Sequence, residues 1–167
     1  ERAEYAYFTK AYRSENVALF VRKTDIKKYE HYSLQELASV LTGIGVEFGN
    51  TYGNEMGALL AEMGEKVQRV NNNRQNIPKL LGGRIDGYLG HLPYDAMQIK
   101  SKGLENEIGM LPVSLVNTGD IHFMLSKLAN SEEVFRALDA GLAEIKANGT
   151  YDKIIKKYSD KYGLSHW

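Results

Sequence analysis

Short apolar runs alternate with amphipathic segments through the middle of this sequence. Residues 17–21 form a continuous apolar run, apolar residues alternate along 44–48, and 67–70 and 85–89 have the length of short strands. Between them, apolar residues recur every three or four positions, as they do on the buried face of a helix. Strands that alternate with helices form βαβ units, so the sequence predicts an α/β fold with a mainly parallel sheet.

Residues that favour helix ends show where several helices begin and stop. Ser33 and Glu36 have the spacing of a capping box, which predicts a helix from residue 34. Asn130 is placed to cap a later helix, and Gly149 is placed to end it. The two C-terminal helices are predicted to carry apolar stripes, formed by Val134, Leu138, Leu142 and Ile145 and by Tyr151, Ile154, Ile155 and Tyr158.

Composition argues against several classes of function. The chain has 21 basic and 21 acidic side chains, whereas a nucleic-acid partner would need a basic face. It has no cysteine, which excludes disulfides, zinc–thiolate sites and cysteine nucleophiles. No apolar stretch approaches the ~18 residues of a membrane span. The opening residues contain no signal peptide, so we expect a mature product or a fragment.

No arrangement of reactive side chains indicates an enzyme. The four histidines, His31, His91, His122 and His166, show no metal-ligand spacing. The sequence contains no nucleophile elbow, P-loop, complete dinucleotide fingerprint or zinc-protease motif. No pair of catalytic carboxylates stands out either. We therefore expect no catalysis, no metal and no cofactor.

The most informative local pattern is a strand followed by Gly49-Asn50-Thr51 and then a helix. The unpaired amides at a helix N-terminus bind carboxylate or phosphate well. Gly49 would let the backbone approach a ligand closely, and the Thr51 hydroxyl could donate one more hydrogen bond. Alternatively, Asn50 or Thr51 simply caps the helix. The local pattern leaves both interpretations open.

Segments over nearly the whole chain, taken in order, resemble bacterial extracellular solute-binding proteins of family 3. The resemblance includes Gly49-Asn50-Thr51-Tyr52 and Gly82-Gly83-Arg84-Ile85-Asp86-Gly87. The other similar segments are residues 2–12, 17–23, 33–37, 44–46, 138–142 and 145–154.

The resemblance implies a type II periplasmic-binding-protein-like α/β fold, with two lobes joined by two hinge strands. Lobe 1 would comprise residues 1–22 together with the return strand and C-terminal helices of 118–167, and lobe 2 would comprise 23–117. Residues 17–21 and 121–125 are predicted to run antiparallel as the hinge strands. The sheet of lobe 2 would use 44–48, 67–70, 85–89 and 108–113. Lobe 1 would be incomplete, because the family's amino-terminal segment is missing.

The resemblance also implies a ligand site. Gly49, Asn50, Thr51 and Tyr52 would hold a ligand carboxylate, and Thr9 and Tyr12 would lie near the rim of the cleft. In amino-acid binders of the family, an acidic residue commonly pairs with the ligand ammonium at the position that His91 occupies here. A neutral imidazole cannot replace that charge, so we expect His91 to lie at the cleft and free amino acids to bind poorly. Alternatively, His91 is a surface loop residue.

By this resemblance, the protein would capture a small polar ligand, an amino acid or related carboxylate, in the periplasm for the membrane permease of an ABC transporter. The alternative is the ligand-sensing input domain of a membrane-bound signalling protein, a role in which the same fold also serves. If the N-terminal segment is truly absent, a swapped dimer could complete lobe 1.

Overall fold

The chain forms two compact units in the computed structural model, which describes residues 2–114, 116–129 and 132–163. Unit 1 comprises residues 1–15 and 119–167, and unit 2 comprises residues 16–118. The expected boundaries lay at 22/23 and 117/118, so residues 16–22 lie with unit 2 instead of with the chain's two ends. No helix in the described ranges is both long and apolar enough to cross a bilayer.

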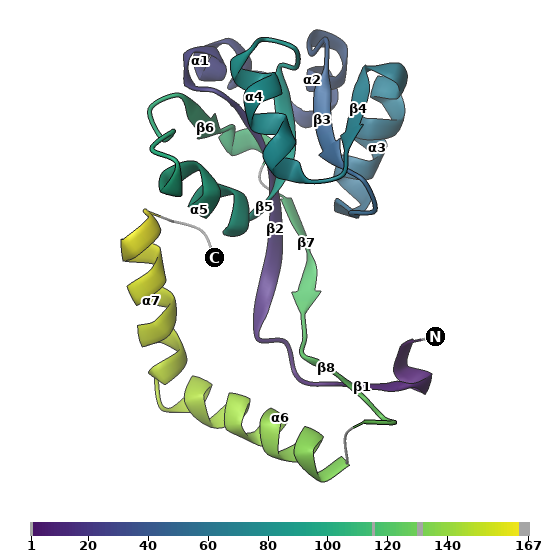
Figure 1. Ribbon diagram of the computed structural model, residues 1–167, viewed down its shortest axis with the longest axis vertical. Coiled ribbons are helices and arrows are strands. Elements are labelled where there is room, and N and C mark those ends of the chain that lie inside the picture. The colour runs from purple at the N-terminus through teal and green to yellow at the C-terminus, as the bar shows by residue number, and fades with distance from the viewer. Residues whose placement is uncertain (1, 115, 130–131, 164–167) are drawn as a thin grey trace. The chain divides into compact units, whose positions relative to one another are not determined.

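Unit 2 is a sheet with helices on both faces, and strands and helices alternate along its chain (Figure 1). Its elements are β2 (Arg13–Arg22), α1 (Ile26–Tyr29), α2 (Leu34–Val40), β3 (Ile44–Glu47), α3 (Gly53–Met63), β4 (Val67–Val70), α4 (Asn76–Leu81), β5 (Gly87–Leu92), α5 (Tyr94–Ser101), β6 (Ile108–Met110) and β7 (Val116–Ile121). The strands β2 and β7 cross the boundaries between the units, which fall at 15/16 and 118/119.

The sheet is mixed, which corrects the expectation of a mainly parallel one. Its order is β4-β3-β5-β2-β6, and β7 pairs with β2 beside this path. The strand β3 is parallel to β4 and β5, as the βαβ crossovers require. The strand β2 is antiparallel to β5 and β6. It precedes the first crossover, so no βαβ connection constrains its direction.

The central position of β2 explains its continuous apolar run. Val17, Leu19 and Val21 lie in the core that also contains α2 and α3. Ala18 and Phe20 lie in the second core, which contains α4 and α5. Successive side chains point to opposite faces of a strand, and both faces of β2 are covered, so all five residues are buried.

Residues 17–21 and 121–125 do not pair in the predicted way, although β2 does pair with β7, which ends at Ile121. Residues 17–21 pair with β5 and, in part, with β6. The run 121–125 is not one strand, because β7 ends at Ile121 and β8 (Met124–Ser126) pairs with β1 (Ala6–Phe8). A hydrogen bond from Tyr12 N to Ile121 O joins the residue before β2 to the last residue of β7.

Local signals predicted several element ends correctly. Ser33 accepts a hydrogen bond from the backbone of Glu36, whose side chain accepts from Ser33 N, so the capping box of α2 is confirmed. The strand β4 has its predicted bounds, whereas β5 begins two residues later than expected, at Gly87. The predicted cap Asn130 lies outside the described residues.

Unit 1 contains β1, β8, α6 (Glu132–Ala147) and α7 (Thr150–Tyr162), but it has little apolar core. Among its described residues, Ala6 and Leu142 are the buried hydrophobic ones. The predicted helix stripes remain largely uncovered, since Val134 is 50% exposed and Ile154 is 45% exposed. This part of the chain thus leaves apolar surface without a partner in the structure.

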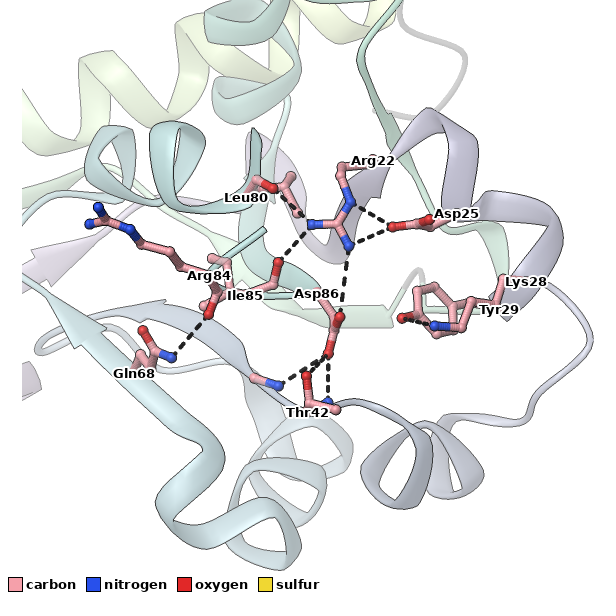
Figure 2. Close-up of polar contacts among 11 residues, drawn as sticks. Arg22, Asp25, Lys28, Tyr29, Thr42, Gln68, Leu80, Arg84, Ile85 and Asp86 are labelled. Atoms are coloured by element: carbon pink, nitrogen blue, oxygen red, sulfur yellow. Dashed lines mark hydrogen bonds and ion pairs between the residues drawn. The ribbon is translucent and has the colours of Figure 1, made fainter. Parts of the chain in front are cut away.

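Asp86 ties the start of β3 to the start of β5, as Figure 2 shows. Its Oδ2 accepts hydrogen bonds from Thr42 Oγ1 (2.6 Å) and from the backbone amides of Thr42 and Gly43. Arg22 lies 3.7 Å from Oδ1 and also donates to the carbonyls of Leu80 and Ile85. Burial alone would raise the pKa of Asp86, but these hydrogen bonds and the Arg22 charge hold it below its ordinary value.

The Asp86→Asn variant should lower the free energy of unfolding by about 1–3 kcal/mol at neutral pH, because one accepting oxygen and the charge are lost. The lowered pKa means that this stabilisation is present above the ordinary carboxyl range and is lost as the pH falls through the folded pKa. Urea unfolding near pH 7 and near pH 3 measures both effects. The exposed Asp160→Asn is the control, and equal losses in the two variants would contradict this role of Asp86.

Candidate functional site

The candidate site lies at the carboxyl ends of the parallel strands of unit 2. From β3 the chain passes to α3, which packs in one core, and from β5 it passes to α5, which packs in the other. The connections after these two neighbouring strands therefore leave toward opposite faces of the sheet. In α/β sheets, ligands bind outside the carboxyl ends of the strands at such a point.

The loop after β3 has the predicted order of strand, glycine, threonine and helix. Gly49 has a φ of 83°, which favours glycine, and α3 begins at Gly53. Asn50 and Thr51 are exposed, whereas Tyr52 is buried. The N-cap of α3 is Tyr52, and its side chain forms no capping hydrogen bond. The alternative in which Asn50 or Thr51 caps this helix is therefore wrong.

A hollow of about 500 Å³ opens beside this loop. Asn50, Thr51 and Tyr52 line it together with one side of the first three turns of α3. Arg69 of β4 lines it as well, and its side chain is exposed. Our reading of the sequence missed Arg69, because an arginine on a short strand carries no local signal of a site. The hollow thus combines amide, hydroxyl and guanidinium donors.

Tyr52 links the loop after β3 to His91 of β5. The Tyr52 Oη accepts a hydrogen bond from Glu47 N (2.8 Å), and its ring stacks on the His91 ring with centroids 5.4 Å apart. Burial raises the pKa of Tyr52. His91 is half-buried within β5 and pairs with Val17, so it is not a surface loop residue as in the alternative above.

Asp95 is a buried carboxyl group under the end of β5, with a relative exposure of 3%. Its Oδ2 accepts from His91 N (2.9 Å), and its Oδ1 accepts from Asn73 Nδ2 (3.0 Å). A Cβ at position 90 would lie 2.8 Å from this carboxyl, so only glycine fits there. Burial raises the pKa of Asp95 to about 7; the Glu47 charge also raises it, and the two hydrogen bonds oppose the rise.

Asn73 connects this carboxyl group to the end of β3. It lies in the 3-10 turn Asn73–Gln75 after β4, and its backbone amide donates to Glu47 Oε2 (2.9 Å). Its side-chain amide also donates to the carbonyl of Leu89 in β5. The sequence predicts only a loop at residues 71–73, and nothing in it distinguishes Glu47 or Asp95. Their roles depend on three loops meeting in space, for which local spacing gives no signal.

Thr9 and Tyr12, the other expected site residues, lie in unit 1. Thr9 is buried, and its Oγ1 donates to Lys10 O and accepts from Phe123 N. The Tyr12 ring stacks on Phe123 with centroids 4.6 Å apart. The hydroxyl of Thr9 is thus already engaged within unit 1, whereas Gly49, Asn50, Thr51, Tyr52 and His91 all belong to unit 2.

The buried Asp95 should make stability depend on pH. A folded pKa near 7, above the ordinary carboxyl value, stabilises the fold fully at low pH, and this contribution is lost as the pH rises through about 7. The free energy of unfolding should fall by on the order of a few kcal/mol between about pH 4 and pH 8. Asp95→Asn should remove most of this slope in urea titrations, whereas the exposed Asp152→Asn should not. If the free energy of unfolding depends on pH equally in Asp95→Asn and in the wild type, Asp95 is not the cause of this dependence.

Solved structures of transport proteins have the same fold. The second substrate-binding domain of GlnP from Lactococcus lactis, in an open conformation, has 25% identity, a TM-score of 0.65, and covers 94% of this chain and 63% of its own. An amino acid ABC transporter substrate-binding protein from Streptococcus pneumoniae, bound to L-arginine, has 22% identity, a TM-score of 0.69, and coverages of 95% and 62%. A mutant of ArgBP from T. maritima has 17% identity and a TM-score of 0.70, and the match covers 95% of this chain and 64% of ArgBP.

The chain spans less than two thirds of the length of these structures, which agrees with a type II periplasmic-binding-protein fold whose first lobe is incomplete. No curated protein sequence matches the chain. The profile of bacterial extracellular solute-binding proteins, family 3, matches residues 1–161. With the fold and the position of the candidate site, this match shows that the chain belongs to the bacterial extracellular solute-binding proteins of family 3.

Proposed function

We propose that the protein captures a small polar ligand, an amino acid or related carboxylate, in the periplasm and delivers it to the membrane permease of an ABC importer. The function is binding, with no chemical step. Membership of the family supports the class of function. The ligand-binding residues in this proposal are Thr9, Tyr12, Gly49, Asn50, Thr51, Tyr52 and His91.

The donors around the hollow after β3 are the observation that carries the proposal. Thr51 is exposed beside the N-terminus of α3, where backbone amides lack partners within the helix. The partial positive charge of that helix end and the Arg69 guanidinium both favour an anion. A ligand carboxylate could take hydrogen bonds from Thr51 and from the adjacent amides at once.

The environment of His91 argues for a ligand without a free ammonium group. Two of the similar solved structures are described as an ancestral arginine-binding protein, one bound to arginine and one to glutamine. A carboxylate that balances an ammonium must be accessible and charged. Asp95 is not accessible, since it is buried and both its oxygens accept internal hydrogen bonds, and its pKa, raised to about 7, leaves it only partly ionised at neutral pH. We infer that organic acids bind better than free amino acids.

The uncovered apolar surface of unit 1 indicates that further polypeptide completes it. Leaving the stripes of α6 and α7 in water costs about 25 cal/mol for each Å². We propose that the remainder of lobe 1 covers them, supplied by this protein or by a second copy through domain swapping. The full-length protein is therefore the one to use in binding experiments.

A thermal-shift screen of amino acids, organic acids and short peptides tests the proposed function. A ligand that binds only the folded state raises the melting temperature, and calorimetry then gives its Kd. Thr51→Ala should weaken binding of a carboxylate by about 0.5–1.5 kcal/mol, or roughly two- to tenfold in Kd. Thr24 is exposed and follows the end of β2 that pairs with the start of β5, so it lies away from the candidate site. Thr24→Ala should therefore leave Kd unchanged. If no compound of the three classes shifts the melting temperature, the proposed function is wrong.

His91→Asp should strengthen the binding of free amino acids. The new carboxylate would stand where amino-acid binders of the family commonly hold the ligand ammonium, and a charge-assisted pair there should lower Kd by about tenfold or more. Calorimetry with standard amino acids measures the change. His31→Asp adds the same charge at an exposed position of unit 2 and should have no effect. Tight binding of a standard amino acid by the unaltered protein would contradict the inference about His91.

A further inference from the structure

The three loops at the carboxyl edge of the sheet are joined in a closed circuit of contacts. Glu47 N donates to Tyr52 Oη, and the Tyr52 ring stacks on His91. His91 N donates to Asp95, which also accepts from Asn73 Nδ2. Asn73 N then donates to the Glu47 side chain, which closes the circuit. The ends of β3 and β5 and the segments that follow β3, β4 and β5 all supply members, and Asp95 comes from the first turn of α5.

We propose that Asp95 is a positioning residue for the ligand site, which holds the His91 ring in place through the backbone of β5 and makes its position depend on pH. This inference rests on the proposed function only where it concerns the ligand. Asp95 does not touch the ligand in this scheme, because it is buried and its carboxyl lies against Gly90.

The shape of the site requires a carboxyl group at position 95. Two N–H donors, from His91 and Asn73, point at its two oxygens at 2.9 and 3.0 Å. Only an ionised carboxylate offers acceptors on both oxygens without a proton of its own. An asparagine would place an NH₂ group against one of the two donors. The absence of a side chain at Gly90 leaves room for the carboxyl directly against the strand.

The surroundings of Asp95 make its ionisation sensitive to pH near neutrality. The titratable groups that face it are Tyr88 and His91 of β5, Glu47 of β3 and Tyr52 of the loop after β3, while Asn73 of the turn after β4 contributes its side-chain amide. His91 faces it through its backbone amide, since its ring stacks on Tyr52. Burial and the Glu47 carboxylate both raise the pKa of Asp95, to about 7.

Protonation of Asp95 should loosen the circuit. One of the accepting oxygens then becomes a hydroxyl, so the bond from His91 N or from Asn73 Nδ2 weakens. His91 lies near the end of β5, where it pairs with Val17. A displacement of the His91 backbone amide therefore also moves the His91 ring, which stacks on Tyr52. At a pH above the midpoint of the Asp95 titration, both hydrogen bonds to Asp95 form and the stack of His91 on Tyr52 is fixed. At a pH below that midpoint, the His91 ring gains freedom.

Nuclear magnetic resonance on the full-length protein without ligand tests this coupling. The ¹³C carboxyl shift of Asp95 reports its own titration, for which we expect a midpoint near pH 7. The side-chain amide of Asn73 and the ring protons of Tyr52 should shift with the same midpoint. An Asp95 titration that leaves the Tyr52 ring protons unmoved would overturn the proposal, and so would an Asp95 midpoint below about pH 5.

Two variants separate the effect of the Asp95 carboxyl group from any effect of the His91 ring. His91→Gln keeps the backbone amide and removes the imidazole, so the Asn73 amide should still titrate with Asp95. Asp95→Asn should abolish that titration of Asn73. If Asp95→Asn does not fold, Asn73→Ala replaces it, because loss of a hydrogen bond that lowers the pKa should move the Asp95 midpoint upward. An unchanged midpoint in Asn73→Ala, or loss of the Asn73 titration in His91→Gln, would contradict the circuit.

A ligand found in the screen adds a functional readout. The ratio of the Kd of Asp95→Asn to that of the wild type should be about threefold larger at pH 8 than at pH 6, because the intact circuit forms only when Asp95 is ionised. A ratio independent of pH would show that Asp95 has a purely structural role. If no ligand binds, the proposed function fails, while the resonance measurements still decide whether Asp95 positions His91.

Discussion

The parallel pairing of β3 with β5 is the contact on which the rest of unit 2 depends. Ile44 and Gly45 pair with Gly87 and Tyr88, and each end of this short pair is fixed by an acidic side chain. At the start of the strands, Asp86 holds the backbone of Thr42 and Gly43. At the end, Asp95 and its partners connect the following loops. With both ends fixed, the loops that carry the candidate site have a defined geometry.

The pKa values of Asp86 and Asp95 are shifted in opposite directions, because different interactions dominate at each carboxyl group. Hydrogen bonds and the Arg22 charge outweigh the burial of Asp86, which stays ionised and stabilises the fold at neutral pH. Burial outweighs the hydrogen bonds of Asp95, which lies beside the Glu47 carboxylate and exchanges its proton near neutrality. The structural end of the sheet is therefore insensitive to pH above the ordinary carboxyl range. The end that carries the candidate ligand site is sensitive to it.

Sequence reasoning succeeded where a feature is local. The capping box of Ser33, the bounds of β4 and the order of strand, Gly49-Asn50-Thr51 and helix each depend on a few neighbouring residues, and each is confirmed. It failed where long-range pairing decides. The apolar run 17–21 predicted a buried strand correctly, but nothing in the sequence indicated that β2 pairs with β5 and β6 as well as with β7, which ends at Ile121. A buried run carries no information about which strand lies beside it.

The sequence by itself determined the alternation of strands and helices, the order of motifs that resembles family 3, and the candidate residues 49–52 and 91, because spacing and residue type encode these features locally. Only the tertiary structure decided that β2 is central and antiparallel, that Arg69 lines the hollow, and that Glu47, Asn73 and Asp95 meet. Glu47, Asn73 and Asp95 are separated by up to about fifty positions and belong to three different elements, β3, the 3-10 turn after β4 and α5. Their hydrogen bonds and the raised pKa of Asp95 exist only once the strands have brought the loops together.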